Sequence, residues 1–203
     1  MLRVISNGKK NFDNEHRLYH IDNTGNLSTD YITVNSAQIL EELSKTPVKT
    51  IGGFSINSYT SSEKNDIFNV FKFAADNTSV EWVVHRNNNS YTIGTAHDSY
   101  SSGGWPDYME TTPQASVHSH PGIRSAIGEE LFSMGNDNGN VVYGSDWNRV
   151  IRDVNSNGTQ MRKNYVYFPI SPRLYHVGYH GPSYIRNINN YKKFYVGALI
   201  YNK

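Results

Sequence analysis

The chain has 203 residues, of which 37% are hydrophobic, a formal net charge of +1 and no cysteine. This length suits one hydrophobic core. The near-neutral charge with scattered basic residues argues against a nucleic-acid partner, and the absence of cysteine excludes disulfides and thiolate metal ligands. No apolar run reaches membrane-spanning length, and the N-terminal residues lack the apolar core of a signal peptide. The compartment stays open, because a dedicated apparatus can export a protein without a signal peptide.

Residues 1–60 are polar and rich in turn-forming residues, and we expect a lead-in segment here, such as the junction to a larger protein. We expect residues 61–203 to form the functional domain. Within the lead-in, the patterns predict two short strands near residues 18–21 and 31–34, a helix around residues 37–44 and a break at Pro47.

A helix is predicted directly after the lead-in. Thr60-Ser61-Ser62-Glu63 has the form of a capping box. The apolar residues behind it recur at helical spacing: Ile67, Val70, Phe71 and Ala74. Two strands, residues 80–85 and 90–96, are then predicted on either side of an asparagine-rich hairpin turn. The long, breaker-rich loop over residues 98–113 is of the kind that often borders active sites.

The most informative stretch is His118-Ser119-His120-Pro121, which follows a short strand-like run. Side chains two residues apart in an extended segment point to the same face. Both imidazoles can therefore converge on one metal ion, and zinc is the metal that best suits neutral imidazole nitrogens in a tetrahedral site. Two histidines at this spacing are also common as structural residues, so the surrounding sequence has to support a metal site.

A hydrolytic zinc site also needs a third ligand and a carboxylate that takes a proton from the attacking water. Glu81 begins a run of β-branched and aromatic residues, where it either faces the core at high cost or lies on a solvent-facing edge strand. Asp146 stands where a second helix is predicted, and its first turn would point the carboxylate toward the histidines. The apolar stripe of that helix is Trp147, Val150, Ile151 and Val154.

Further strands are predicted over residues 165–168, 174–178, 183–188 and 194–201. With the helices, they predict an α+β domain whose mixed, largely antiparallel sheet is flanked by helices.

These residues resemble the JAB/MPN (JAMM) zinc metalloproteases, whose motif is a glutamate on an early strand, then H-S/T-H-P, then S-x-x-D at the start of a helix. The likeness covers roughly residues 61–200 and includes the order of the elements. The chain looks closest to the JAB-like toxin domains at the C-termini of bacterial polymorphic and Rhs-type toxins. The resemblance implies the cytidine-deaminase-like arrangement of the JAB/MPN fold.

The resemblance further implies that His118, His120 and Asp146 bind Zn2+ and that Glu81 is the general base and acid. The chain departs from the family pattern in its spacing, because 25 residues (146 − 120 − 1) separate His120 from Asp146. Asp137 is the competing third ligand, although its surroundings predict a turn, whereas Asp146 opens a periodic helix.

The serine of the family's S-x-x-D element is also missing, since the residue three before Asp146 is Tyr143. Ser145 is the nearest candidate for a catalytic hydroxyl that stabilises the oxyanion. It can equally be the N-cap of the predicted helix.

The implied function is a zinc-dependent metallopeptidase or isopeptidase that acts as the effector (toxin) domain of a secreted bacterial protein. Its partners would be a protein or peptide substrate and an immunity protein, with no nucleic acid and no membrane span. A catalytically inactive JAB-like protein-interaction module is the alternative, which the missing serine favours. A zinc-dependent hydrolase of another bond, such as a nuclease, is disfavoured by the near-neutral charge.

Overall fold

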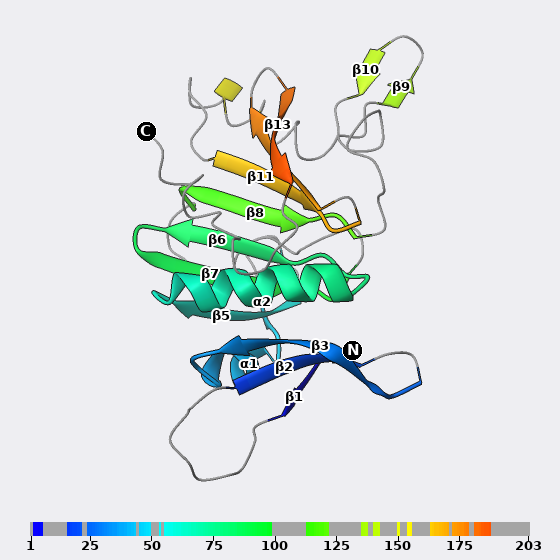
Figure 1. The fold of residues 1–203 in the computed structure, drawn as a ribbon. Coiled ribbons are helices and arrows are strands. Elements are labelled where there is room, and N and C mark those ends of the chain that lie inside the picture. Colours follow the sequence, from blue (N-terminus) through cyan, green and yellow to red (C-terminus); the bar gives the residue numbers. More distant parts are fainter. Residues whose placement is uncertain are drawn as a thin grey trace.

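The computed structural model describes residues 2–5, 16–21, 24–43, 45–49, 53, 55–98, 113–121, 135–137, 140–142, 150, 154–155, 163–170, 172–178 and 181–187. The centre of the molecule is an eight-stranded sheet with the strand order β13-β12-β11-β8-β6-β7-β5-β4 (Figure 1). Its strands are β4 (Val48–Lys49), β5 (Ser55–Ser61), β6 (Val83–Asn87), β7 (Ser90–Thr95), β8 (Ala115–Ser119), β11 (Lys163–Phe168), β12 (Arg173–Gly178) and β13 (Gly181–Asn187).

Neighbouring strands of this sheet run antiparallel, apart from β8 and β11, which are parallel. The predicted α+β architecture with a mixed, largely antiparallel sheet is therefore confirmed. Strand β8, which carries the two histidines, lies inside the sheet between β6 and β11. A strand that is hydrogen-bonded on both sides gives its side chains a fixed direction.

Helix α2 (Lys64–Asn77) lies across one face of the sheet (Figure 1). Its apolar residues recur three or four positions apart and form one stripe, and every member predicted from the sequence is buried: Ile67, Val70, Phe71 and Ala74. They share a core with Val84, Ile93 and Val117 of the sheet. Each large side chain buried there contributes about 1.5–3 kcal/mol of stability, so this face anchors the fold.

The start of α2 differs from the predicted capping box. Thr60 and Ser61 belong to strand β5, and the residue before the helix is Glu63, which makes no side-chain cap hydrogen bond. The Ser61 Oγ instead accepts the N–H of Glu63 at 2.9 Å. Because β5 pairs with β7 as far as Ser61, the chain stays extended there and tertiary pairing overrides the local signal.

β6 and β7 form the predicted hairpin. Asn87 pairs with Ser90, so Asn88 and Asn89 make a two-residue turn. Asn88 has a φ of 54°, a left-handed conformation that asparagine adopts more readily than most residues. The first strand begins at Val83 rather than at residue 80, which leaves Glu81 just before the regular ladder.

A second sheet, of three strands, and a short helix precede the large sheet: β1 (Leu2–Ile5), β2 (His16–Ile21), β3 (Leu27–Val34) and α1 (Gln38–Leu43). The strands and the helix predicted in this segment are confirmed. Leu18, Ile32 and Ile39 share the core beneath α2, and the Asp66 carboxylate accepts the N–H of Asn35 at 2.8 Å. Strand β5 crosses residue 60, and the division into 1–60 and 61–203 stays a prediction.

Strands β9 (Gly135–Asp137) and β10 (Asn140–Val142) form a small antiparallel hairpin where the sequence predicts a turn. Val150, Val154 and Asn155 are helical, in agreement with the helix predicted after Asp146. The predicted strands over residues 165–168, 174–178 and 183–188 are observed as β11, β12 and β13, and residues 194–201 lie outside the described residues. No helix in the described parts of the chain is long and apolar enough to cross a membrane.

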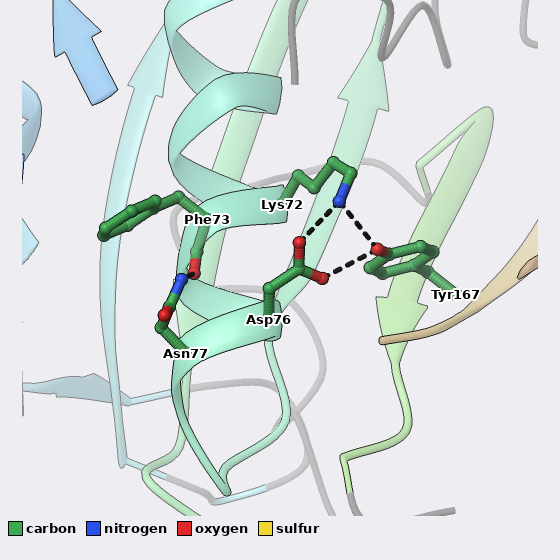
Figure 2. A network of polar contacts seen from close by, with 5 residues as sticks. All are labelled: Lys72, Phe73, Asp76, Asn77 and Tyr167. Carbon is green, nitrogen blue, oxygen red and sulfur yellow. Dashed lines mark hydrogen bonds and ion pairs between the residues drawn. The ribbon is translucent and has the colours of Figure 1, made fainter. Parts of the chain in front are cut away.

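A polar network joins α2 to the sheet (Figure 2). The Nζ of Lys72, a residue only 3% exposed, donates to the carboxylate of Asp76 and, at 2.9 Å, to the Tyr167 hydroxyl. That hydroxyl donates in turn to Asp76 Oδ1 at 2.7 Å. A buried charge is tolerable only when it is paired and hydrogen-bonded. The three side chains meet that condition together, and they fix α2 against β11.

Candidate metal centre

The rings of His118 and His120 face each other at the end of β8. Their Nε2 atoms lie 3.0 Å apart, and their ring centroids are 4.9 Å apart. His118 is the fourth residue of the strand and His120 follows its last residue. The prediction that the two side chains point to the same face is confirmed.

Two nitrogens at this distance form a hydrogen bond when one Nε2 carries a hydrogen and the other accepts it. The other arrangement that brings two imidazole lone pairs together is a shared cation. Two ligands of a tetrahedral zinc ion at about 2.0–2.1 Å from the metal lie roughly 3.3 Å from each other. The observed 3.0 Å between the nitrogens is close to that separation, so the pair fits a zinc ion.

Strand β11 holds His120 in place. The His120 N–H donates to the Tyr167 carbonyl at 2.9 Å, so its backbone continues the parallel pairing of β8 with β11. The ring of Phe168 packs edge-on against the His120 ring, with centroids 5.4 Å apart. His118 is flanked by Val83 on β6 and Val166 on β11. Ring positions that are fixed by packing and hydrogen bonding suit a preformed ligand pair.

Glu81 lies beside these histidines. The residue is 7% exposed, and its Oε1 atom is 3.9 Å from the Nε2 of His120. The pairing of Val83 with His118 explains this position, because the strands are antiparallel: Glu81, two residues before Val83, lies across from His120, two residues after His118. The alternative of a solvent-facing glutamate on an edge strand is therefore wrong. A carboxylate beside two imidazoles is placed to accept a proton from a molecule bound next to them.

The backbone around Glu81 is held by groups that the sequence reasoning did not single out. Its N–H donates to the Asp98 carbonyl at 2.7 Å, and its carbonyl accepts the Thr95 hydroxyl at 2.8 Å. The next residue, Trp82, donates its N–H to Ser119 Oγ at 3.0 Å. The available signal was position, since Thr95 ends one strand of the hairpin and Ser119 lies between the two histidines.

The remaining predicted site residues are not placed. Asp146 and Ser145 lie outside the described residues, and of Asp137 only the backbone, in strand β9, is described. Within the described ranges, no group of three or more histidine, cysteine or acidic residues is arranged to hold a metal ion. The structure therefore brings together His118, His120 and Glu81, and the third ligand stays a prediction.

A row of buried polar side chains crosses the same face of the sheet as His118. Ser116 is two residues before His118 and shares its direction, and register places the other members beside it: Thr92, His85 and Asn164. The His85 Nδ1 and Ser116 Oγ atoms are 2.8 Å apart. Among the described residues, the buried Nδ2 of Asn164 has no hydrogen-bond partner. The alternation of apolar and polar residues from Ala115 to His118 was the signal for this polar face.

An apolar cluster closes the other side of the histidines. It consists of Val150, Val166, Phe168, Tyr175 and Val177. Val166 pairs with His118 in the ladder, and Phe168 contacts the His120 ring. Val150, although far along the chain, is therefore packed with residues of β11 and β12, next to the strand that carries the histidines.

His176 belongs to a different environment. Its ring packs against Tyr165 with centroids 5.3 Å apart. Burial, and then the positive charge of Lys163, lower the pKa of His176, while burial raises the pKa of Tyr165. Both shifts favour the neutral side chain, as expected for residues that serve packing.

Comparison with known proteins finds one family model that matches the part of the chain containing these residues. Residues 59–150 match the family model described as JAB-like toxin 1. The matched segment contains Glu81, His118, His120 and Asp146. No curated protein and no solved structure matches the chain. Residues 59–150 thus carry a JAB-like toxin domain.

Proposed function

We propose that this domain is a zinc-dependent peptidase or isopeptidase of the JAMM type, with the JAB/MPN-like (cytidine-deaminase-like) fold. It would act as the toxin, or effector, part of a secreted bacterial protein and would be neutralised by an immunity protein. The single observation that carries the proposal is the convergence of the His118 and His120 Nε2 atoms beside the buried carboxylate of Glu81. The match to the JAB-like toxin family supports the toxin role.

The metal in this proposal is held by His118, His120 and Asp146. Val150 supports Asp146 as the third ligand, because it lies four residues after Asp146 and packs with Val166 and Phe168 beside the histidines. Asp137, in the β9–β10 hairpin, is the competing ligand. Two imidazoles and one carboxylate would supply the three protein ligands that are usual in catalytic zinc sites.

Glu81 moves the proton in the proposed reaction. When bound, zinc polarises the scissile carbonyl and lowers the pKa of a coordinated water. Glu81 takes the proton from the attacking water and delivers it to the departing amine, so the same carboxylate serves as base and then as acid. Its burial and its position 3.9 Å from His120 favour this role over that of a surface charge. Ser145 is the proposed hydroxyl that stabilises the oxyanion.

A second candidate is a catalytically inactive JAB-like interaction module. It is favoured by Tyr143, which stands where the family motif has the serine of S-x-x-D. Such a module would keep the fold and the metal ligands and would cleave nothing. Incubation of the zinc-loaded chain with peptide, isopeptide and proteome-wide substrates separates the two, because the peptidase releases products and the module does not.

The zinc content of two matched variants tests the ligand assignment. Asp146→Ala should lose most of its metal, because it removes one of only three protein ligands, whereas Asp137→Ala should keep a nearly stoichiometric amount. Elemental analysis of the purified proteins measures both. Zinc retained by Asp146→Ala and lost from Asp137→Ala would transfer the third ligand to Asp137, and a wild-type chain that binds no zinc would overturn the proposed function.

A further inference from the structure

The ladder between β6 and β8 ends in an unusual way next to Glu81. The last regular pair is Val83 with His118. One step further, the Ser119 N–H donates to the Trp82 carbonyl at 2.9 Å, and the Trp82 N–H donates back to the Ser119 hydroxyl at 3.0 Å. In a regular antiparallel pair this second bond goes to a backbone carbonyl. The Ser119 hydroxyl therefore replaces a backbone carbonyl as the hydrogen-bond acceptor where strands β6 and β8 separate.

A second hydroxyl, that of Thr95, binds the backbone of Glu81. Thr95 Oγ1 donates to the Glu81 carbonyl at 2.8 Å and accepts the His97 N–H at 3.0 Å. One residue further, the Asp98 carbonyl accepts the Glu81 N–H at 2.7 Å. The Thr95 hydroxyl thus connects the carbonyl of Glu81 with the turn that binds its amide.

That turn is itself anchored. His97 has a φ of 56°, a conformation that side-chain-bearing residues adopt only when neighbouring groups hold them there. Its Nε2 atom lies 2.7 Å from Asn57 Oδ1 on β5, and its N–H bonds Thr95. The turn therefore offers Glu81 a fixed acceptor at Asp98.

Both hydroxyls are fully buried, since Thr95 and Ser119 are each 0% exposed. A buried hydroxyl or amide that loses its partner has no water to replace it, so these bonds are costly to break. They bind the two polar groups of the peptide bond between Glu81 and Trp82 and leave the Glu81 side chain in place across from His120. A small displacement of this backbone would change the 3.9 Å between the Glu81 carboxylate and the His120 ring.

We propose that Thr95 and Ser119 are positioning residues, whose buried hydroxyls hold the Glu81–Trp82 backbone so that the Glu81 carboxylate faces His120. Neither hydroxyl touches the reacting atoms in this scheme. The benefit for catalysis rests on the proposed role of Glu81 as the base. The positioning itself does not depend on a metal ion, so it can be measured on the metal-free chain.

Amide hydrogen exchange of the full chain tests the proposal directly. Thr95→Val keeps the shape of the side chain and removes the hydroxyl, and Ser119→Ala removes the other one. Ser119→Ala removes the acceptor of the Trp82 amide, and Thr95→Val loosens the turn whose Asp98 carbonyl binds the Glu81 amide. The Trp82 amide in the first variant and the Glu81 amide in the second should exchange about tenfold faster. The other amides of β6, β7 and β8 should keep their rates. Thr95→Ser restores the hydroxyl and should restore slow exchange.

Thr92→Val is the matched control. Thr92 is a buried threonine on the same strand, 2% exposed, and its hydroxyl bonds Thr60 instead of Glu81. Its loss should leave the Glu81 and Trp82 amides unchanged. If Thr95→Val and Ser119→Ala accelerate exchange evenly over the sheet, as a loss of global stability would, the positioning role is overturned. If Thr95→Val does not fold, Ser119→Ala tests the removal of a hydroxyl by the same exchange pattern, and Thr95→Ser serves as the variant that keeps one.

Turnover of the zinc-loaded chain supplies the second measurement. Thr95→Val should lower kcat with little change in KM, and adding it to Glu81→Gln should cost no further activity, because both changes act through one carboxylate. Additive losses would contradict the positioning role. Localised exchange in a chain that neither binds zinc nor cleaves a substrate would instead uphold the positioning and reject the proposed function.

Discussion

Two groups of buried polar side chains lie on opposite faces of the same sheet, and they satisfy their atoms in different ways. On the α2 face, Lys72, Asp76 and Tyr167 form a closed triangle in which every contact joins a donor to an acceptor (Figure 2). On the other face, His118 and His120 bring two like nitrogens to 3.0 Å, and the Glu81 carboxylate stops 3.9 Å from one of them. The first group is complete by itself, whereas the second has the donor set and spacing of a ligand site.

The difference shows how burial alone is a poor guide to function. Lys72 is 3% exposed and Glu81 is 7% exposed, so both carry a charge into the interior. The lysine, however, has its counter-ion one helical turn away on α2, at a spacing that favours contact. Convergent imidazole nitrogens beside a carboxylate suggest a ligand site, and a closed set of donor–acceptor pairs suggests stability.

The largest expected effect comes from breaking the closed triangle. Lys72→Met should lower the free energy of unfolding by about 2–4 kcal/mol, because it leaves the Asp76 carboxylate without its cation. Chemical denaturation measures the change. Lys45→Met is the control, since Lys45 forms an exposed pair with Glu42 and should cost less than about 1 kcal/mol. Equal losses in the two variants would remove the contrast between a structural network and a surface pair.

The next effect concerns turnover rather than stability. Glu81→Gln keeps the size and much of the hydrogen bonding of the side chain but cannot accept the proton of the attacking water. It should lower the turnover of the zinc-loaded chain by at least ~10²-fold, with the zinc content and the unfolding midpoint unchanged. Peptide cleavage assays measure the rate. Wild-type turnover in this variant would reject Glu81 as the general base and leave it a structural role, like that of the Lys72, Asp76 and Tyr167 network.

The smallest effect separates the two faces by their response to metal. Zinc in tenfold excess over its dissociation constant should stabilise the wild-type chain by about 1.4 kcal/mol, because the metal binds only the folded state. His118→Ala should abolish this response, and His97→Ala, which removes an exposed histidine, should keep it. Thermal unfolding with zinc and with a chelator measures both. An unchanged zinc response in His118→Ala would rule out this histidine as a ligand.

Much of the fold follows from local patterns. The stripe of Ile67, Val70, Phe71 and Ala74 predicts α2 because helical spacing is a property of the chain itself. The Asn88 turn and the convergence of the two histidines follow from equally local geometry. The capping box at Thr60 failed because a partner strand, β7, keeps that residue extended.

The candidate site was predictable only in part, because some of its bonds join residues far apart in the chain. The role of Glu81 as general base and acid was implied by a resemblance, and its burial across from His120 depends on the register of β6 with β8. The bond of the Ser119 hydroxyl to Trp82 depends on the same register, and the bond of the Thr95 hydroxyl to Glu81 depends on the register of β6 with β7. Serine and threonine are common in strands and loops, so their types alone do not reveal such partners.

The parallel pairing of β8 with β11 also explains how the spacing of this chain can depart from that of the JAMM motif it resembles. Parallel neighbours need a crossover connection, and here it leaves the sheet after His120 and carries both Asp146 and the β9–β10 hairpin. The cost of closing such a loop grows only with the logarithm of its length, about 0.6 kcal/mol per doubling. A crossover can therefore acquire a hairpin at little entropic expense, while the strands that hold the histidines keep their register.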